Sequence, residues 1–334
     1  MNALYGMMIT EKGLECLNNN KDESNIYLYN FSWTEAEYSL CQLERRAIFG
    51  QSTSSSIIMS SIEIDPSRSP FIKEQIKIMF SAGTIEELLE KVKSMPTLTT
   101  TYKVKVINPW GLDKQNKIPF EERRRIERNF GMAIPGIPDL HNAECTFAII
   151  RVEEKWYFGQ YTGNRAIWLL HQQKPHQYST ALSTRVARAV VNIAAPNPIG
   201  LKIIDPCCGI GTVLVEALSM GMNMIGSDNN PLVMKGAREN IAHFGLEGKV
   251  LLRDIRDVKE KYDSAIIDMP YNLCSVITEE EKLELIASAR SFTSRLVIVT
   301  IEPMDSIIIQ AGFEIIDRGV VKKGSFTREV IVCE

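Results

Sequence analysis

Regular alternation of short apolar strands with helices constrains the fold of this 334-residue chain more than any other feature, and it begins near Ser183. Parallel strands need a helical crossover between them, whereas antiparallel strands can be joined by a tight turn. The alternation therefore predicts an α/β domain with a doubly wound, Rossmann-like parallel sheet. Its predicted strands are Leu201–Ile204, Met224–Gly226, Val250–Leu252, Ser264–Ile267 and Leu296–Thr300. Two further strands, Phe313–Val321 and Glu329–Cys333, predict a terminal antiparallel hairpin.

The first half predicts a smaller α+β region. Ile26–Phe31 alternates as a strand does, and Ser32 with Glu35 predicts a capping box for a helix that ends near Phe49. Further predicted elements are the strand Ile57–Ile64, the helix Ile85–Met95, the strand Thr101–Ile107, the helix Phe120–Phe130 and the strands Cys145–Val152 and Trp156–Gln160. We expect four segments, which are residues 1–95, residues 96–162, a linker over 163–182, and the doubly wound domain over 183–334.

Composition excludes several classes of protein. No apolar run approaches the length of a membrane span, and no secretion signal stands at the start, so a cytoplasmic protein is expected. Seven scattered cysteines and four histidines show no metal-ligand spacing, which predicts reduced thiols and no metal site. The net charge of −3 gives no global indication of nucleic-acid binding.

Informative residues follow the first three strands of the second half. Gly209 and Gly211 let the chain turn tightly and approach a ligand, but Leu214 replaces the third glycine of the dinucleotide fingerprint, which disfavours NAD. Asp228 suits hydrogen bonds to ribose hydroxyls, and Asp254 suits an adenine amine. Taken singly, each of these two acids is equally well explained as a helix N-cap or a surface residue.

The fourth strand ends in the sequence Asp268-Met269-Pro270-Tyr271-Asn272. An exocyclic base amine is a poor nucleophile because its lone pair is delocalised into the ring. A carboxylate and a backbone carbonyl that accept its two N–H bonds would direct that lone pair at an electrophile. Tyr271 would stack on the base. The alternative is a turn that only caps a buried strand. That alternative does not account for the glycine turn, Asp228 and Asp254 that follow the three preceding strands.

These motifs resemble motifs I to IV of class I methyltransferases that act on exocyclic amines. Lys174-Pro175-His176 and the segment Ser183–Ala194 are similar to the region before motif I in THUMP-containing tRNA guanine-N2 methyltransferases. Upstream, residues 130–159 resemble the end of a THUMP domain. The family places a ferredoxin-like domain, then THUMP, before the methyltransferase domain, so residues 1–95 would be ferredoxin-like and residues 96–162 THUMP-like.

The resemblance implies S-adenosylmethionine (SAM) as cofactor, tRNA as substrate, and methyl transfer to the N2 amine of a guanosine. It implies that SAM is bound by Asp205, Cys207, Gly209, Gly211, Asp228, Asn229, Asp254 and Ile255. The base would be held by Asp268, Pro270 and Tyr271. Base flipping is expected, because the amine cannot be reached in a stacked helix.

A local excess of positive charge lies in the THUMP-like segment, where eight basic and four acidic residues stand between Lys103 and Arg128. A solvated helix face and an RNA-binding surface both fit this charge pattern. With the resemblance, the RNA-binding candidates are Lys103, Lys105, Arg123, Arg124, Arg125 and Arg128.

The sequence departs from the family at Met269, where proline is usual, at Asn272, where glycine is common, and in Lys174–Thr184, which lacks the proline-rich lead-in. The same chemistry on ribosomal RNA guanine or on adenine N6 therefore remains an alternative. A SAM-binding RNA assembly factor without turnover is a further one. The sequence also leaves monomer and homodimer open.

Overall fold

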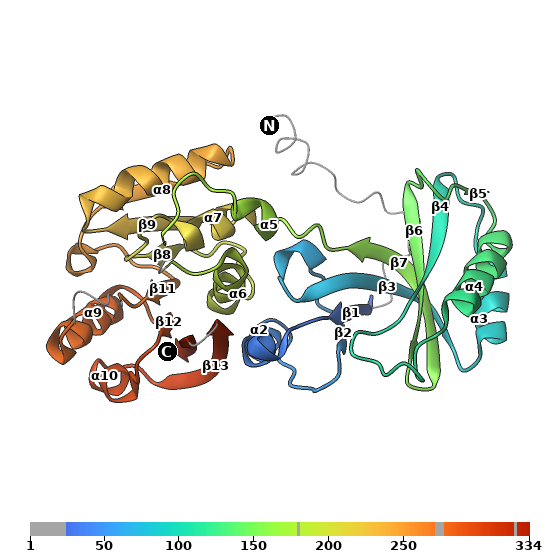
Figure 1. The fold of residues 1–334 in the computed structure, drawn as a ribbon, viewed down its shortest axis with the longest axis horizontal. Coiled ribbons are helices and arrows are strands. Elements are labelled where there is room, and N and C mark those ends of the chain that lie inside the picture. The colour runs from blue at the N-terminus through green and yellow to red at the C-terminus, as the bar shows by residue number, and fades with distance from the viewer. Residues whose placement is uncertain (1–24, 179–180, 271–276, 324–325) are drawn as a thin grey trace.

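The computed structural model describes residues 25–178, 181–270, 277–323 and 326–334. Two seven-stranded sheets lie side by side, one built from the first half of the chain and one from the second (Figure 1). Within the described residues no helix is long and apolar enough to cross a membrane.

The second sheet has the strand order β10-β9-β8-β11-β12-β14-β13. Its strands are β8 (Ile203–Asp205), β9 (Met224–Asp228), β10 (Lys249–Leu252), β11 (Ser264–Asp268), β12 (Leu296–Thr300), β13 (Ile315–Lys323) and β14 (Phe326–Cys333). The first five strands are parallel, and β14 pairs antiparallel with both β12 and β13. This confirms the predicted doubly wound sheet and its terminal hairpin. The strand order switches from one side of β8 to the other between β8 and β11, and doubly wound sheets bind ligands at such a switch point.

Helices cover both faces of the second sheet. Ile203 and Ile266 face one layer, formed by α6 (Thr184–Ala194), α7 (Thr212–Ser219) and α8 (Pro231–His243). Ile204 and Ile267 face the other, formed by η3 (Ile255–Asp257), α9 (Glu279–Phe292) and α10 (Asp305–Gln310). Neighbouring strand residues thus enter opposite cores, as the alternation of side chains along a strand requires.

The first sheet has the order β2-β1-β3-β7-β6-β4-β5. Its strands are β1 (Tyr27–Phe31), β2 (Ile57–Ser60), β3 (Ile72–Ala82), β4 (Thr101–Ile107), β5 (Ile137–Pro138), β6 (Cys145–Val152) and β7 (Lys155–Gly163). The helical elements of this half are η1 (Glu35–Glu37), α2 (Tyr38–Phe49), η2 (Pro66–Arg68), α3 (Ile85–Lys93), α4 (Phe120–Ala133) and α5 (Trp168–His171). Strand β3 pairs with β7, so the sheet continues across the predicted boundary at residue 95. The domain boundaries stay predictions.

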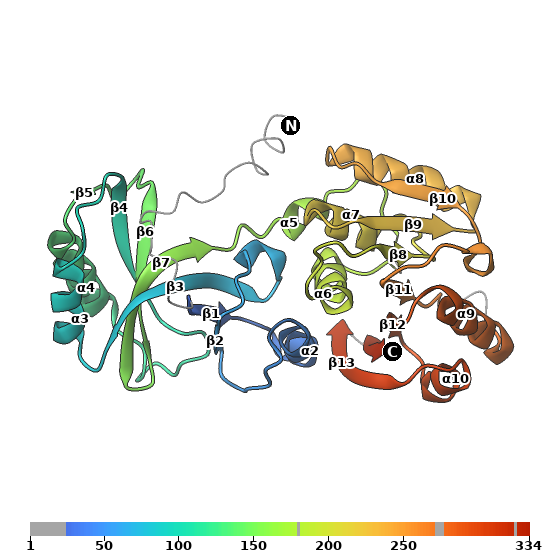
Figure 2. The ribbon, with the colours of Figure 1, turned by 180° about the vertical axis from the view of Figure 1, so that it is seen from behind.

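Helices α2 and α6 join the two halves. Leu40 and Leu43 of α2 share one apolar core with Val186 and Val190 of α6. Strand β13 also packs on α2, where Arg46 makes a 2.7 Å ion pair with Asp317. Both views show α2 beside α6 at the junction (Figures 1 and 2).

Three local predictions for the first half are corrected. The capping box is Thr34 with Glu37 rather than Ser32 with Glu35, because the Ser32 amide donates to the Phe71 carbonyl at 2.8 Å and keeps that residue extended. Strand β3 was not predicted, since register shifts near Ile78 blur its period-two pattern. The predicted connector contains the short helix α5.

The prediction of reduced thiols holds for only part of the described chain. Cys41, Cys207, Cys208 and Cys333 are free, whereas Cys145 is disulfide-bonded. No cluster of metal-ligating side chains occurs among the residues that the structure describes.

Candidate active site

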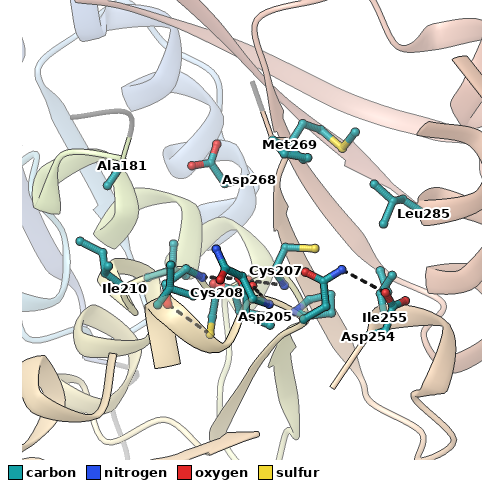
Figure 3. A pocket seen from close by; sticks show the side chains of 18 of the residues that line it. Ala181, Asp205, Cys207, Cys208, Ile210, Asp254, Ile255, Asp268, Met269 and Leu285 are labelled. Atoms are coloured by element: carbon teal, nitrogen blue, oxygen red, sulfur yellow. Dashed lines mark hydrogen bonds between the residues drawn. The ribbon is translucent and has the colours of Figure 1, made fainter. Parts of the chain in front are cut away.

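A cavity of about 440 Å³ opens where β8, β9 and β11 end. Asp205, Asp228 and Asp268 are the last residues of these strands, and all three line it. Because the strands are parallel, their carboxyl ends meet at one edge of the sheet. Figure 3 shows Asp268 on the opposite side of the cavity from Asp205 and Cys208.

The glycine turn after β8 forms one wall. Gly209 and Gly211 have φ values of +51° and +77°, a left-handed conformation that glycine adopts without steric cost. The Gly211 amide donates to the Cys208 carbonyl at 2.8 Å and closes the turn. A Cβ atom on Gly209 would meet no atom within 4 Å, because the position borders the cavity. The turn therefore leaves room for a ligand to approach its backbone.

Asp228 ties that turn to the end of β9. One carboxylate oxygen accepts from the Gly209 amide and the other from the Asn230 amide, each at 2.9 Å. Each oxygen keeps a further lone pair, so the carboxylate can also accept from a pair of ribose hydroxyls.

The side chain of Asp254 is held by hydrogen bonds from two nearby side chains. Its carboxylate accepts from Arg256 Nε at 2.8 Å and from Asn229 Nδ2 at 3.1 Å. These bonds, with that to Arg256 foremost, hold the pKa of Asp254 well below its ordinary value. A ligand amine would thus share this carboxylate with Arg256.

Asp268 differs from the other acids. Its Oδ1 atom is buried and has no hydrogen-bond partner among the described residues. Burial raises the pKa of Asp268 to about 7, and the positive charge of Arg328 opposes that rise. A buried acceptor without a partner costs free energy, so this oxygen is poised to receive a hydrogen-bond donor from a ligand.

Asp205 adds a further carboxyl group to the site. It accepts from the Cys207 amide at 3.2 Å. Burial raises the pKa of Asp205 well above its ordinary value, and the nearby charges of Asp268 and Asp228 raise it further. Three carboxyl groups in one cavity favour a ligand that carries positive charge.

Residues 171–297 match the family model described as UPF0020, an RMKL-like methyltransferase domain. This segment resembles a methyltransferase domain of that family. Its family takes the methyl group from SAM, whose sulfonium carries a positive charge. The residues that line the cavity, including the glycine turn and the aspartates at the strand ends, all lie within the matched segment.

Curated relatives match part of the chain. A tRNA (guanine(10)-N2)-dimethyltransferase of Methanothermobacter thermautotrophicus is 36% identical over 121 residues, which are 34% of this chain and 35% of the relative. The protein of the same name from Pyrococcus abyssi is 27% identical over 158 residues, 44% of this chain and 47% of the relative. The matches thus span between a third and a half of these relatives. Among solved structures, TrmN from Thermus thermophilus aligns with 92% of this chain and 99% of its own, with 18% identity and a TM-score of 0.48.

The residues of the methyltransferase domain fit SAM on two observations beyond the acids. Thr212 Oγ1 lines the cavity, is buried and has no described partner, so it offers a second unsatisfied polar atom to a ligand. The open space beside Gly209 would let SAM approach the backbone of the glycine turn.

The structure brings most of the predicted site residues together. Those that line the cavity are Asp205, Cys207, Gly209, Asp228, Asn229, Asp254, Ile255, Asp268 and Pro270. Gly211 does not line it and begins α7 beside Ala237 instead. Tyr271 and Asn272 lie outside the described residues. The individual roles of these residues remain predictions.

Sequence reasoning missed several lining residues of the methyltransferase domain. Tyr178, Ala181 and Leu182 precede α6 and contribute one wall. Their segment resembles the region before motif I, a resemblance that could have pointed to them. Arg256 was also missed, although an arginine two residues after an acid is a recognisable local ion pair.

The six predicted RNA-binding residues lie away from this cavity and on two faces of the first sheet. Tyr102, Val104 and Val106 of β4 point into the core beneath α4, so Lys103 and Lys105 between them point to the opposite face. Arg123, Arg124, Arg125 and Arg128 lie on α4 itself. Two of them form ion pairs within the helix, Arg124 with Glu127 and Arg125 with Glu122.

Proposed function

We propose that the chain transfers a methyl group from SAM to the exocyclic N2 amine of a guanosine in tRNA. The observation that carries the proposal is a buried Asp268 oxygen that lines the cavity with the glycine turn and has no hydrogen-bond partner among the described residues. The names of the curated relatives support guanine and tRNA, and guanine 10 is the position to examine first. The proposed compartment is the cytoplasm.

In this proposal SAM supplies an electrophilic methyl group on a sulfonium. Asp268 accepts one N–H bond of the flipped guanine, and the backbone carbonyl of Pro270 accepts the other. The nitrogen lone pair then points at the methyl carbon, which provides the orientation on which much of the rate depends. The N–CH₃ bond forms as the S–CH₃ bond breaks, and the methylated nitrogen gives its proton to the Asp268 carboxylate. A pKa near 7 suits a group that must accept a proton and release it to water.

The test uses purified full-length chain, methyl-labelled SAM and unfractionated tRNA, followed by mass spectrometry of the digested nucleosides. We expect label in N2-methylguanosine or N2,N2-dimethylguanosine. Label in N6-methyladenosine would contradict the target, and label only with ribosomal RNA would contradict the substrate. SAM binding without transfer to any RNA of the natural pool would favour an assembly factor.

A second RNA substrate has one supporting observation. A bovine U6 snRNA (guanine-N(2))-methyltransferase, THUMPD2, is 28% identical over 100 residues, which cover 28% of this chain and 20% of that protein. The shared target atom in both names is guanine N2, so the assay should include other structured small RNAs as well as tRNA.

A further inference from the structure

Three aromatic side chains gather on the surface of the first half. Trp33 lies 5.5 Å from Tyr38 and 4.7 Å from Trp110 between ring centroids. Tyr38 and Trp110 are 39% and 37% exposed. Trp110 belongs to the loop between β4 and α4, and its amide is held by Asn30 Oδ1 at 3.1 Å. We call Trp33, Tyr38 and Trp110 the aromatic cluster.

The aromatic cluster lies on the cavity side of the molecule. Helices α2 and α6 run parallel, because Glu37 pairs with Arg185 at 2.6 Å near their starts and Glu44 accepts from Asn192 at 2.6 Å further along. Helix α6 begins two residues after Leu182, which lines the cavity. Tyr38, at the start of α2, therefore lies toward the cavity rather than toward the far end of the helices.

The β13–β14 hairpin packs against α2 and η1, the elements that carry or adjoin Tyr38. Strand β13 runs along α2 toward the start of that helix, since Asp317 pairs with Arg46 while the Val320 amide donates to Ser39 Oγ at 2.9 Å. Strand β13 also contacts η1, and Lys322, two residues further along the strand than Val320, is exposed. On β14, Phe326 is 58% exposed, and Arg328 is near enough to Asp268 to act on its carboxylate.

Acidic groups in this region are largely neutralised within the protein. Glu37 pairs with Arg185, and Glu329 pairs with Arg318 at 2.9 Å. Glu35 is exposed. The surface therefore combines exposed aromatic rings with available positive charge, the composition that single-stranded nucleic acid recognises.

We propose that the aromatic cluster, Phe326 and Lys322 form a surface that binds the RNA strand adjoining the target guanosine. This inference rests on the proposed function. Flipping the target base breaks its stacking with both neighbours, so those neighbours gain from stacking on protein rings. Lys322 would contact a phosphate of the same strand.

The experiment compares Trp110→Ala, Phe326→Ala and Lys322→Glu in the full-length chain, with unfractionated tRNA as the probe. Removing one stacking ring should weaken RNA binding and lower kcat/KM by roughly tenfold. Lys322→Glu should reduce the slope of log affinity against log salt by about 1. Lys249→Glu is the matched control, because Lys249 is an exposed lysine on β10 at the opposite edge of the sheet. Unchanged SAM affinity and melting temperature would verify that each variant is folded.

The outcomes separate this inference from the proposed function. If the wild type methylates tRNA and both alanine variants bind and methylate it as well as the wild type, the surface is wrong and the function stands. If the wild type methylates no RNA, yet the variants lose RNA affinity while Lys249→Glu does not, the function is wrong and the surface stands.

Discussion

The two sheets of this chain organise polar residues in opposite ways. In the second sheet, parallel strands bring Asp205, Asp228 and Asp268 from distant positions to one edge and into one cavity. In the first sheet, alternation along β4 and the overlying helix α4 separate the predicted basic residues onto two faces. The basic residues are close in sequence, yet they do not share one surface. The three aspartates are distant in sequence, and their equivalent positions at the ends of parallel strands correctly predicted that they share one.

The comparison also concerns how the charges are satisfied. In the cavity, a buried oxygen of Asp268 has no hydrogen-bond partner among the residues that the structure describes, so it is available to a ligand. On α4, Arg124 and Arg125 already pair with glutamates of their own helix. We therefore expect changes at the second sheet to have larger effects than changes at the first.

The largest effect is expected for Asp268→Ala. Removing the acceptor that orients the amine should lower kcat by roughly 10²–10³-fold, the size seen when one preorganised polar contact is removed. SAM affinity, measured by calorimetry, should change little. Glu314→Ala is the control because Glu314 is an exposed carboxylate outside the cavity, and it should retain full activity. Transfer at the wild-type rate in Asp268→Ala would remove this carboxylate from the mechanism.

A pH series of melting experiments tests the state of Asp268. Its folded-state pKa of about 7 exceeds the unfolded value near 4, so the stability that it contributes is present below about pH 4 and declines as pH rises through 7. Asp268→Asn removes this dependence and should stabilise the ligand-free protein at pH 8 by on the order of 2 kcal/mol relative to wild type. At pH 3.5 to 4 the two proteins should melt within about 2 °C of each other. Parallel profiles across the whole range would show that the folded carboxyl titrates normally.

Glycines from the two halves give a matched pair. Gly209→Ala places a Cβ at a φ of +51° and beside the cavity, so it should cost about 1 kcal/mol of stability and weaken SAM binding by about tenfold. Gly131→Ala lies within α4 with open space around it, and alanine there should stabilise the helix by up to about 1 kcal/mol. Denaturant unfolding and SAM titration measure both effects. Equal SAM affinity in the two variants would contradict the role assigned to the turn.

The smallest effect is expected for the basic residues of the first sheet. Charge reversal at Arg123, Arg124 and Arg125 should weaken tRNA binding severalfold and flatten its salt dependence. The double variant Lys103→Glu with Lys105→Glu alters the opposite face. If tRNA contacts one of the two faces, its affinity should fall mainly in the variant that alters that face. Salt titrations of both variants would identify the face. A slope unchanged by either would exclude the whole segment as an RNA contact.

Sequence patterns predicted the second half closely because its elements are local and regular. Strand β12, for example, spans Leu296–Thr300 as predicted. In the first half, β3 was missed although it is the longest strand described. Its irregular pairing to β1 and β7 depends on partners that are distant in sequence, and no local pattern encodes them.

The sequence by itself determined the doubly wound sheet, the glycine turn and the acids at the strand ends, because strand periodicity and turn chemistry depend on neighbouring residues. Only the tertiary structure decided that Asp254 is held by Arg256, that a buried oxygen of Asp268 has no partner among the described residues, and that β13 packs along α2 as far as Ser39. These features depend on which side chains meet across elements, and burial and hydrogen-bond partners are fixed only when the elements pack.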